Sequence, residues 1–174
     1  MTDSLNTTIQ PPTETHDLGR ALGMLVRSYH DQVTAAVGDM PHGYRGYQVL
    51  ATVMHGDHPN QLAIATHLGI DRTVMTYVID DLVNANLVER QPDPNDRRAR
   101  RIVATPEGRR IFEALEQRVH AAETMLLGCL SASDQVTFRN MLCRVATLAG
   151  TLSPESDSCT VIAHLLGNDN EPSR

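Results

Sequence analysis

The sequence contains no tryptophan and no lysine, and its four tyrosines and two phenylalanines make up only 3% of the 174 residues. Because 41% of the residues are nevertheless hydrophobic, we expect a core built mainly from aliphatic side chains. No apolar run approaches the roughly 20 residues that a membrane-spanning helix needs, and no signal peptide is recognisable. We therefore expect a cytoplasmic protein without a membrane partner. Its length suits one domain, or a small domain with a dimerisation extension.

Catalytic signatures are absent as well. The sequence has no Gly-x-Ser-x-Gly elbow, no phosphate-binding loop, no His-Glu-x-x-His motif and no dinucleotide fingerprint. An enzymatic function and a bound cofactor therefore have no residues to carry them. His55 and His58 flank Asp57, but a metal site needs about four ligands and no further ones are evident. We expect a polar surface turn at this point and no metal.

Only three cysteines are present, and all lie in the carboxy-terminal part of the chain. Cys129 and Cys143 fall on apolar helix faces, so we expect buried thiols there. Cys159 is expected to be exposed, and it is the best candidate for a redox-sensitive thiol. No structural disulfide is expected in a cytosolic protein.

The net charge of −6 argues against a nucleic-acid ligand only until its distribution is considered. Residues 88–110 hold seven of the 15 basic residues, all arginines, but only four of the 21 acidic ones. The local charge is thus +3, beside −9 over the remainder. Such a basic stripe on an acidic body is typical of a surface that attracts phosphate. A charge run is more often a solvated face, so the local structure has to decide.

A helix-turn-helix pattern precedes the basic stripe. Asn60 can cap a helix over 61–68, and Gly69 supplies the turn that ends it. Asp71 is a good cap for a second helix, which is expected to stop near Asn86, a residue that tolerates a left-handed C-cap conformation.

The second helix has one apolar and one polar face. Its buried stripe is predicted from the spacing of three and four to comprise Val74, Met75, Val78, Ile79 and Leu82. Residues near the amino-terminal end of a recognition helix read base edges. Four such residues fall off the stripe here and are candidates for DNA contact: Arg72, Thr73, Thr76 and Tyr77.

A β-hairpin follows this helix. One strand is expected to start at Leu87 and a second to cover 100–104, joined by a turn rich in proline and asparagine. The tip carries Asp96 followed by Arg97 and Arg98. The carboxylate can pair with one guanidinium and brace the tip, which leaves the other to enter an electronegative minor groove.

Helices are expected on both sides of this unit, over 15–37, 44–54, 105–130, 133–150 and 154–166. Their apolar stripes are too long for so small a monomer to bury. We expect packing against a second copy of the chain, and the competing interpretation is an intramolecular bundle.

The residues from 68 to 108 resemble the signature of the MarR family of bacterial winged helix-turn-helix regulators. The matching pieces are the LG turn, the capped second helix, LVER, the DPxDRR wing and the TPEG helix start. The resemblance extends over roughly 13–150. It implies a mainly helical fold with a small β-hairpin wing and flanking dimerisation helices, used as a homodimeric transcriptional repressor that binds a pseudo-palindromic DNA operator and responds to a small molecule.

The resemblance also implies a division of the chain and roles for single residues. Residues 41–105 would bind DNA, residues 13–40 with 106–166 would form the dimerisation region, and 1–12 and 167–174 would be tails. By family position, three residues of the second helix would face the major groove, namely Thr73, Thr76 and Tyr77. The wing tip would consist of Arg97 and Arg98, with Asp96 as the brace.

Two positions depart from the family pattern. Tyr77 stands where relatives often carry arginine, and Asp81 stands where they often carry a basic residue. Both changes weaken the electrostatic attraction of the helix for DNA, so we expect the wing to supply more of it.

An effector site is predicted between the first two helices, because MarR proteins bind aromatic acids or lipophilic compounds there. The candidates are Arg27, His30, Tyr44 and Tyr47, which could instead be core or interface groups. Two further hypotheses about function stay open. The regulator could be controlled by cysteine oxidation or by a metal, or the winged helix could serve only for protein contacts without DNA.

Overall fold

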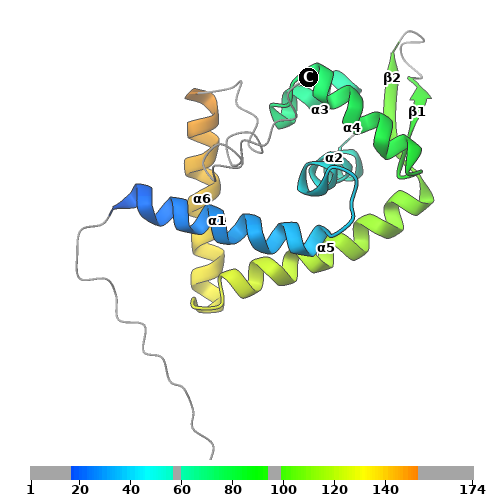
Figure 1. The fold of residues 1–174 in the computed structure, drawn as a ribbon. Coiled ribbons are helices and arrows are strands. Elements are labelled where there is room, and N and C mark those ends of the chain that lie inside the picture. Colours follow the sequence, from blue (N-terminus) through cyan, green and yellow to red (C-terminus); the bar gives the residue numbers. More distant parts are fainter. Residues whose placement is uncertain (1–16, 57–59, 94–98, 153–174) are drawn as a thin grey trace, which may run out of the picture.

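The computed structural model describes residues 17–56, 60–93 and 99–152. Within these ranges the chain forms six helices and one two-stranded antiparallel sheet (Figure 1). The elements are α1 (Leu18–Val37), α2 (Gly43–His55), α3 (Gln61–Leu68), α4 (Arg72–Asn84), β1 (Val88–Pro92), β2 (Arg100–Ala104), α5 (Pro106–Leu126) and α6 (Ala132–Leu152). The predicted fold class, mainly helical with one β-hairpin, is confirmed.

Three side chains cap the helices where the sequence predicted. Asn60 accepts a hydrogen bond from the Ala63 amide at 2.9 Å and starts α3. Asp71 does the same for α4, and Thr105 accepts from the Gly108 amide at the start of α5. Each cap satisfies an amide that has no partner inside its own helix, which fixes where the helix begins. After α4 the chain turns at Asn86, whose φ of 57° is the expected left-handed value.

The hairpin pairs Val88 with Ala104 and Pro92 with Arg100 in antiparallel register. Asn60 adds one bridge to Arg101, which ties the start of α3 to the outer edge of β2. The predicted tip residues Asp96, Arg97 and Arg98 lie outside the described residues, so the hairpin is described as far as Asp93 and from residue 99.

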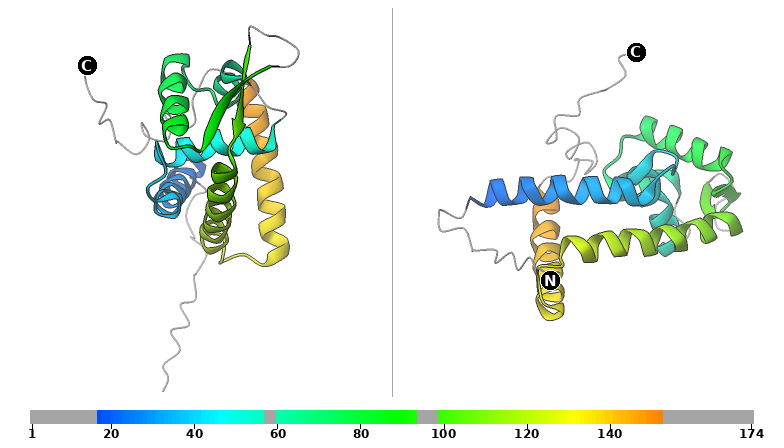
Figure 2. Two further views of the ribbon diagram at one scale, coloured as in Figure 1. Left: turned by 90° about the vertical axis from the view of Figure 1, so that its right-hand side faces the viewer. Right: turned by 60° about the horizontal axis from the view of Figure 1, so that its bottom comes forward.

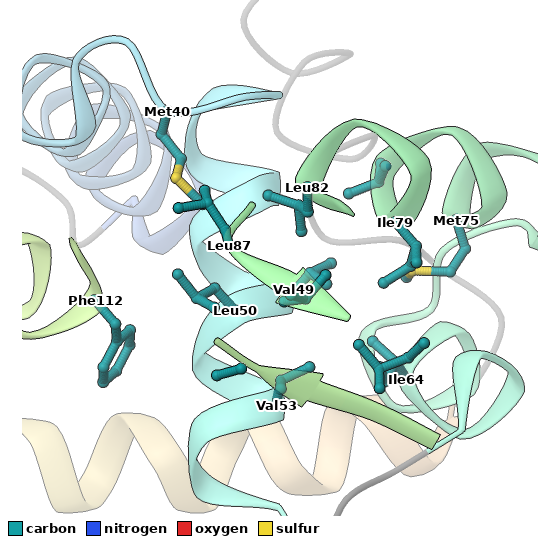
Figure 3. Close-up of a cluster of buried hydrophobic side chains, with 14 of the residues drawn as sticks. Met40, Val49, Leu50, Val53, Ile64, Met75, Ile79, Leu82, Leu87 and Phe112 are labelled. Carbon is teal, nitrogen blue, oxygen red and sulfur yellow. The ribbon is translucent and has the colours of Figure 1, made fainter. Parts of the chain in front are cut away.

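The core is aliphatic, as the composition predicted. Figure 3 shows Met75, Ile79 and Leu82 of α4 pointing towards Val49 of α2 and Ile64 of α3, and all five side chains are completely buried. Helix α4 is therefore fixed to the body along its whole length. One member of the predicted stripe is wrong: Val74, in the first turn of α4 and at the edge of the stripe, is 38% exposed, whereas Val78 one turn further along is completely buried.

Helices α1 and α5 run side by side beneath this core, and α6 stands across the end of the pair that is farthest from the hairpin (Figures 1 and 2). An ion pair of 2.6 Å between Glu123 and Arg139 links α5 to α6. The prediction that Cys129 and Cys143 are buried is wrong, since both are exposed. Cys129 lies in the turn after α5, and the apolar face of α6 that carries Cys143 has nothing to pack against within the described part of one chain.

Element boundaries differ from the predictions by a few residues. Helix α1 begins at Leu18 rather than 15, because Asp17 accepts a hydrogen bond from the Arg20 amide and acts as its cap. Helix α5 ends at Leu126 rather than 130. Ser131 caps α6, because its hydroxyl accepts a hydrogen bond from the Asp134 amide at 3.2 Å and donates one to the Asp134 carboxylate at 2.7 Å. The expected helix over 154–166, Cys159 and both tails lie outside the described residues.

Candidate nucleic-acid interface

Helix α4 presents a polar face at its amino-terminal half. All four predicted contact residues are exposed, namely Arg72, Thr73, Thr76 and Tyr77. Tyr77 is 64% exposed, an unusual degree for a tyrosine. An exposed aromatic ring on a rigid helix presents a flat surface and a phenol hydroxyl to any partner that approaches.

The first turn of α4 is already occupied by a negative charge. The Asp71 carboxylate accepts hydrogen bonds from the amides of Thr73 at 2.7 Å and Val74 at 3.2 Å. These bonds hold the pKa of Asp71 below its ordinary value, so it is fully ionised near neutral pH. Two of the amides that would otherwise attract a phosphate therefore serve the cap.

Two acidic residues further along α4 are both paired. Asp80 accepts a hydrogen bond of 2.6 Å from the Arg90 guanidinium of β1. Asp81 lies 2.8 Å from Nε2 of His42, which precedes α2 and has a left-handed φ of 59°. The sequence suggested that Asp81 weakens the attraction of this helix for DNA, and Asp80 carries the same charge. The structure shows that they also fasten α4 to the hairpin and to the loop before α2.

A chain of hydrogen bonds crosses from β1 to α4 through α3. Arg90 Nη2, which donates to Asp80, also lies 3.4 Å from the amide oxygen of Gln61. The Gln61 amide nitrogen donates to the Thr76 hydroxyl at 2.8 Å, and that hydroxyl donates to the Arg72 carbonyl at 2.9 Å. Sequence analysis missed Gln61 and Arg90 as functional residues, because no local pattern marks contacts between positions 15 and 29 residues apart.

A hollow of about 250 Å³ opens between α3 and α4 beside this chain of hydrogen bonds. It is lined by Gln61, Leu62, Ala65, Arg72, Met75 and Thr76. The side chains of Gln61, Arg72 and Thr76 give it polar groups, and Leu62 and Met75 give it an apolar wall. The surface around the amino-terminal half of α4 is thus concave and chemically mixed.

The basic stripe is less uniformly positive than the count of arginines suggested. Arg90 is paired with Asp80, and Arg110 forms two hydrogen bonds with Glu107, at 2.6 and 2.9 Å. The pairing lowers the pKa of Glu107 and raises that of Arg110, so both stay ionised. Arg101 donates to the Gln91 side chain across the hairpin at 3.0 Å.

The predicted effector residues are only partly brought together. Tyr44 and Tyr47 of α2 stack with their ring centroids 6.0 Å apart, and the Tyr44 hydroxyl lies 2.8 Å from that of Tyr29 on α1. Tyr47 in turn stacks on Phe112 of α5 at 5.8 Å. Arg27 is exposed on α1, away from the buried side of the helix.

Burial raises the pKa of two of these tyrosines. It raises the pKa of Tyr47 to about 12, with the negative charge of Glu116 adding to the effect. Burial also raises the pKa of Tyr29, although its hydrogen bond to Tyr44 opposes the shift. Both phenols are therefore neutral hydrogen-bonding groups under physiological conditions.

Two histidines that sequence analysis considered lie near this row. His30, the fourth effector candidate, is half-buried, and its Nδ1 has no hydrogen-bond partner within the described residues but lies 3.7 Å from the Asp31 carboxylate. His55 packs edge-on against Phe112 at 5.4 Å and lies 3.7 Å from the Glu116 carboxylate.

Over the described parts of the chain, no helix is both long and apolar enough to cross a membrane.

Comparisons with known proteins agree with this architecture. A sequence model of the MarR family matches residues 47–99. The chain is 27% identical over 119 residues to a Thauera aromatica protein named "Putative transcriptional regulatory protein for hcr operon". These residues cover 68% of this chain and 70% of that protein.

Solved structures give the same result. Wild-type MarR from E. coli, in its apo form, is 25% identical, with a TM-score of 0.64 over 76% of this chain and 98% of that chain. A Mycobacterium tuberculosis MarR family protein in complex with DNA is 22% identical, with a TM-score of 0.62 over 78% of this chain and 98% of that chain.

A capped helix with an exposed polar face, preceded by a short helix and followed by a hairpin, defines the winged helix-turn-helix class. Both the fold and its relatives are those of transcription regulators rather than enzymes. In its sequence over residues 47–99 and in its fold, the chain is similar to the MarR family of transcriptional regulators.

Proposed function

We propose that the protein is a homodimeric repressor that binds a pseudo-palindromic DNA operator through α4 and the hairpin wing. The observation that carries the proposal is the exposed polar face of α4, with Thr73, Thr76 and Tyr77 held outward by a completely buried opposite face. A rigid helix with a short, uncharged reading surface suits base edges in a major groove. Residues 41–105 form the DNA-binding part in this proposal.

Exposed apolar surface supports the dimer. On α1, Leu18 is 70% and Met24 is 64% exposed. On α6 the exposed apolar side chains are Val136, Met141, Leu142, Val145 and Leu148, each between 42% and 66% exposed. A stable monomer rarely leaves so much apolar surface in water. We assign residues 13–40 and 106–166 to dimerisation, with α1 and α6 covered by the partner.

The row of aromatic rings supports an effector site. Tyr29, Tyr44 and Tyr47 offer flat apolar faces and neutral hydroxyls where α1, α2 and α5 meet. An aromatic or lipophilic molecule fits such a lining, with a hydroxyl to orient a polar substituent. The site lies beside α1, so an effector bound there would act on the same helices that we assign to the dimer.

A gel-shift assay on the DNA upstream of the protein's own gene tests the central function. We expect a retarded band that survives competition by random duplex and is displaced by the unlabelled upstream fragment. Light scattering at micromolar concentration should give twice the chain mass of 19.1 kDa. Half-sites should lie about 10 base pairs apart, one helical turn. A monomeric mass, or equal competition by random duplex, would refute the proposal.

A control variant separates the dimer from the DNA contacts. Val145→Glu places a charge in the exposed apolar face of α6 and touches nothing near α4. If α6 lies in the dimer interface, this variant should scatter as a monomer at the same concentration and lose cooperative binding to the paired half-sites. Retention of the dimer mass would show that α6 is not in the interface.

A further inference from the structure

We infer that Thr76 reads DNA as a hydrogen-bond acceptor only, and therefore selects a base with an amino group, adenine or cytosine, on the strand it contacts. Gln61, a residue of α3, is the positioning residue that enforces this choice. The inference rests on the proposed function, since it assigns a chemical preference to the reading face of α4.

The two ends of the hydrogen-bond chain fix its direction. A guanidinium has only donors, so Arg90 must donate both to the Asp80 carboxylate and to the Gln61 amide oxygen. The amide oxygen of Gln61 therefore faces Arg90, and its nitrogen faces Thr76. At the other end, the Arg72 carbonyl can only accept, so the Thr76 hydroxyl donates its single hydrogen to it.

In this arrangement the Thr76 hydroxyl can form only one further hydrogen bond, with a ligand. A hydroxyl has one hydrogen and two lone pairs. The hydrogen goes to Arg72, and one lone pair takes the hydrogen of Gln61. The remaining lone pair can only accept a hydrogen bond. The hollow between α3 and α4 opens beside it, so the side chain remains accessible.

The bases differ in what they offer to an acceptor. In the major groove adenine and cytosine present an amino group, whereas guanine and thymine present carbonyl oxygens. An oxygen lone pair opposite a carbonyl oxygen is repulsive. Thr76 should therefore favour adenine or cytosine over guanine or thymine by about fivefold, the lower end of the discrimination for a good base contact.

Selection from a library of random duplexes tests the inference with wild-type protein and three variants. Thr76→Val keeps the shape of the side chain and removes the hydroxyl. Gln61→Met keeps the length of its side chain and removes the donor, which allows the Thr76 hydroxyl to turn. Thr52→Val makes the same chemical change on α2, outside α4 and the hairpin, where the Thr52 hydroxyl donates to the Gln48 carbonyl at 2.9 Å, and serves as the matched control.

We expect one position of the selected site, repeated in both half-sites, to favour adenine or cytosine with wild-type protein and with Thr52→Val. Thr76→Val and Gln61→Met should lose that preference at that position alone. None of the variants changes a charge, so the dependence of affinity on salt should stay the same in all four proteins. That shared slope separates a change in reading from a loss of fold or of phosphate contacts.

Each contrary result has a distinct meaning. A guanine or thymine preference that depends on Thr76, or a Thr76→Val profile identical to wild type, would overturn the inference while the proposed function stands. A Gln61→Met profile identical to wild type would overturn the role of Gln61. Failure of wild-type protein to enrich any sequence would overturn the proposed function, and the inference with it.

Discussion

Two glycines should respond in opposite directions to the same substitution. Gly108 lies in the first turn of α5, where a Cβ atom would come within 1.9 Å of the Leu87 carbonyl oxygen and 2.8 Å of its carbon. Gly23 lies within α1, and a Cβ atom there would have no neighbour within 4 Å. Alanine should therefore destabilise the protein at Gly108 and stabilise it at Gly23.

The magnitudes follow from the two environments. At Gly23 alanine gains about 1 kcal/mol, the difference in helix propensity between the two residues. At Gly108 the backbone of Leu87 must retreat by about 1 Å to bring the contact to 3.0 Å. Overpacking of this kind costs about 2–3 kcal/mol, and more where backbone must move, which outweighs the gain in propensity. The two variants should therefore differ by about 2–4 kcal/mol.

Urea unfolding measures this difference directly. The protein concentration must be the same for both variants, because the apparent stability of a dimer depends on it. The wild-type midpoint should lie between those of Gly23→Ala and Gly108→Ala. If Gly108→Ala is as stable as wild type, then α5 does not pack against the turn between α4 and β1 as closely as the structure shows.

Four further predictions concern the cap of α5, the wing and the aromatic row. Thr105→Val should destabilise the protein by about 2 kcal/mol in urea, because it removes the cap of α5 and the hydrogen bond of 2.6 Å to the Asn86 carbonyl. Replacing Arg97 and Arg98 by alanine should reduce the slope of log affinity against log salt by about 3.6 per dimer if all four arginines touch phosphate, and an unchanged slope in fluorescence anisotropy would show that the wing does not contact DNA. Asp96→Ala should weaken binding in the same assay, because an unbraced wing loses more entropy on docking, whereas tighter binding would show that Asp96 acts only through its charge. Tyr47 has a pKa of about 12 in the folded protein, against an ordinary value of 10.0. Because the unfolded chain ionises first, the stability should fall as the pH rises from 10 to 12 and should not change through Tyr47 below pH 10. In a titration of phenolate absorbance, Tyr47→Phe should lack the phase at the highest pH.

The sequence was most informative where a single residue decides local structure. The caps Asn60, Asp71 and Thr105 were predicted correctly because their side chains bond amides only two or three residues away. The left-handed turn at Asn86 and the second strand, Arg100–Ala104, also depend on local chemistry and were predicted correctly.

Predictions that depend on what a helix packs against were less successful. Cys129 and Cys143 were predicted to be buried on apolar helix faces, but Cys129 lies in the turn after α5, and nothing in the described part of the chain covers the face of α6 that carries Cys143. Val74 was included in the buried stripe because it is apolar, but its angular position places it at the edge. The pairing of Gln61 with Thr76 and Arg90 could not be predicted, because it requires α3, α4 and β1 to be assembled first.

The central claim is that the exposed face of α4 recognises a specific DNA sequence. Fluorescence anisotropy of wild-type protein and of the variant with both Thr73→Ala and Tyr77→Ala, each on the selected duplex and on a scrambled duplex, tests it most directly. Neither substitution changes the charge, so we predict that the variant keeps only the part of the preference that Thr76 supplies and binds the scrambled duplex as wild type does. An undiminished preference in the double variant would contradict the assignment of α4 as the recognition helix.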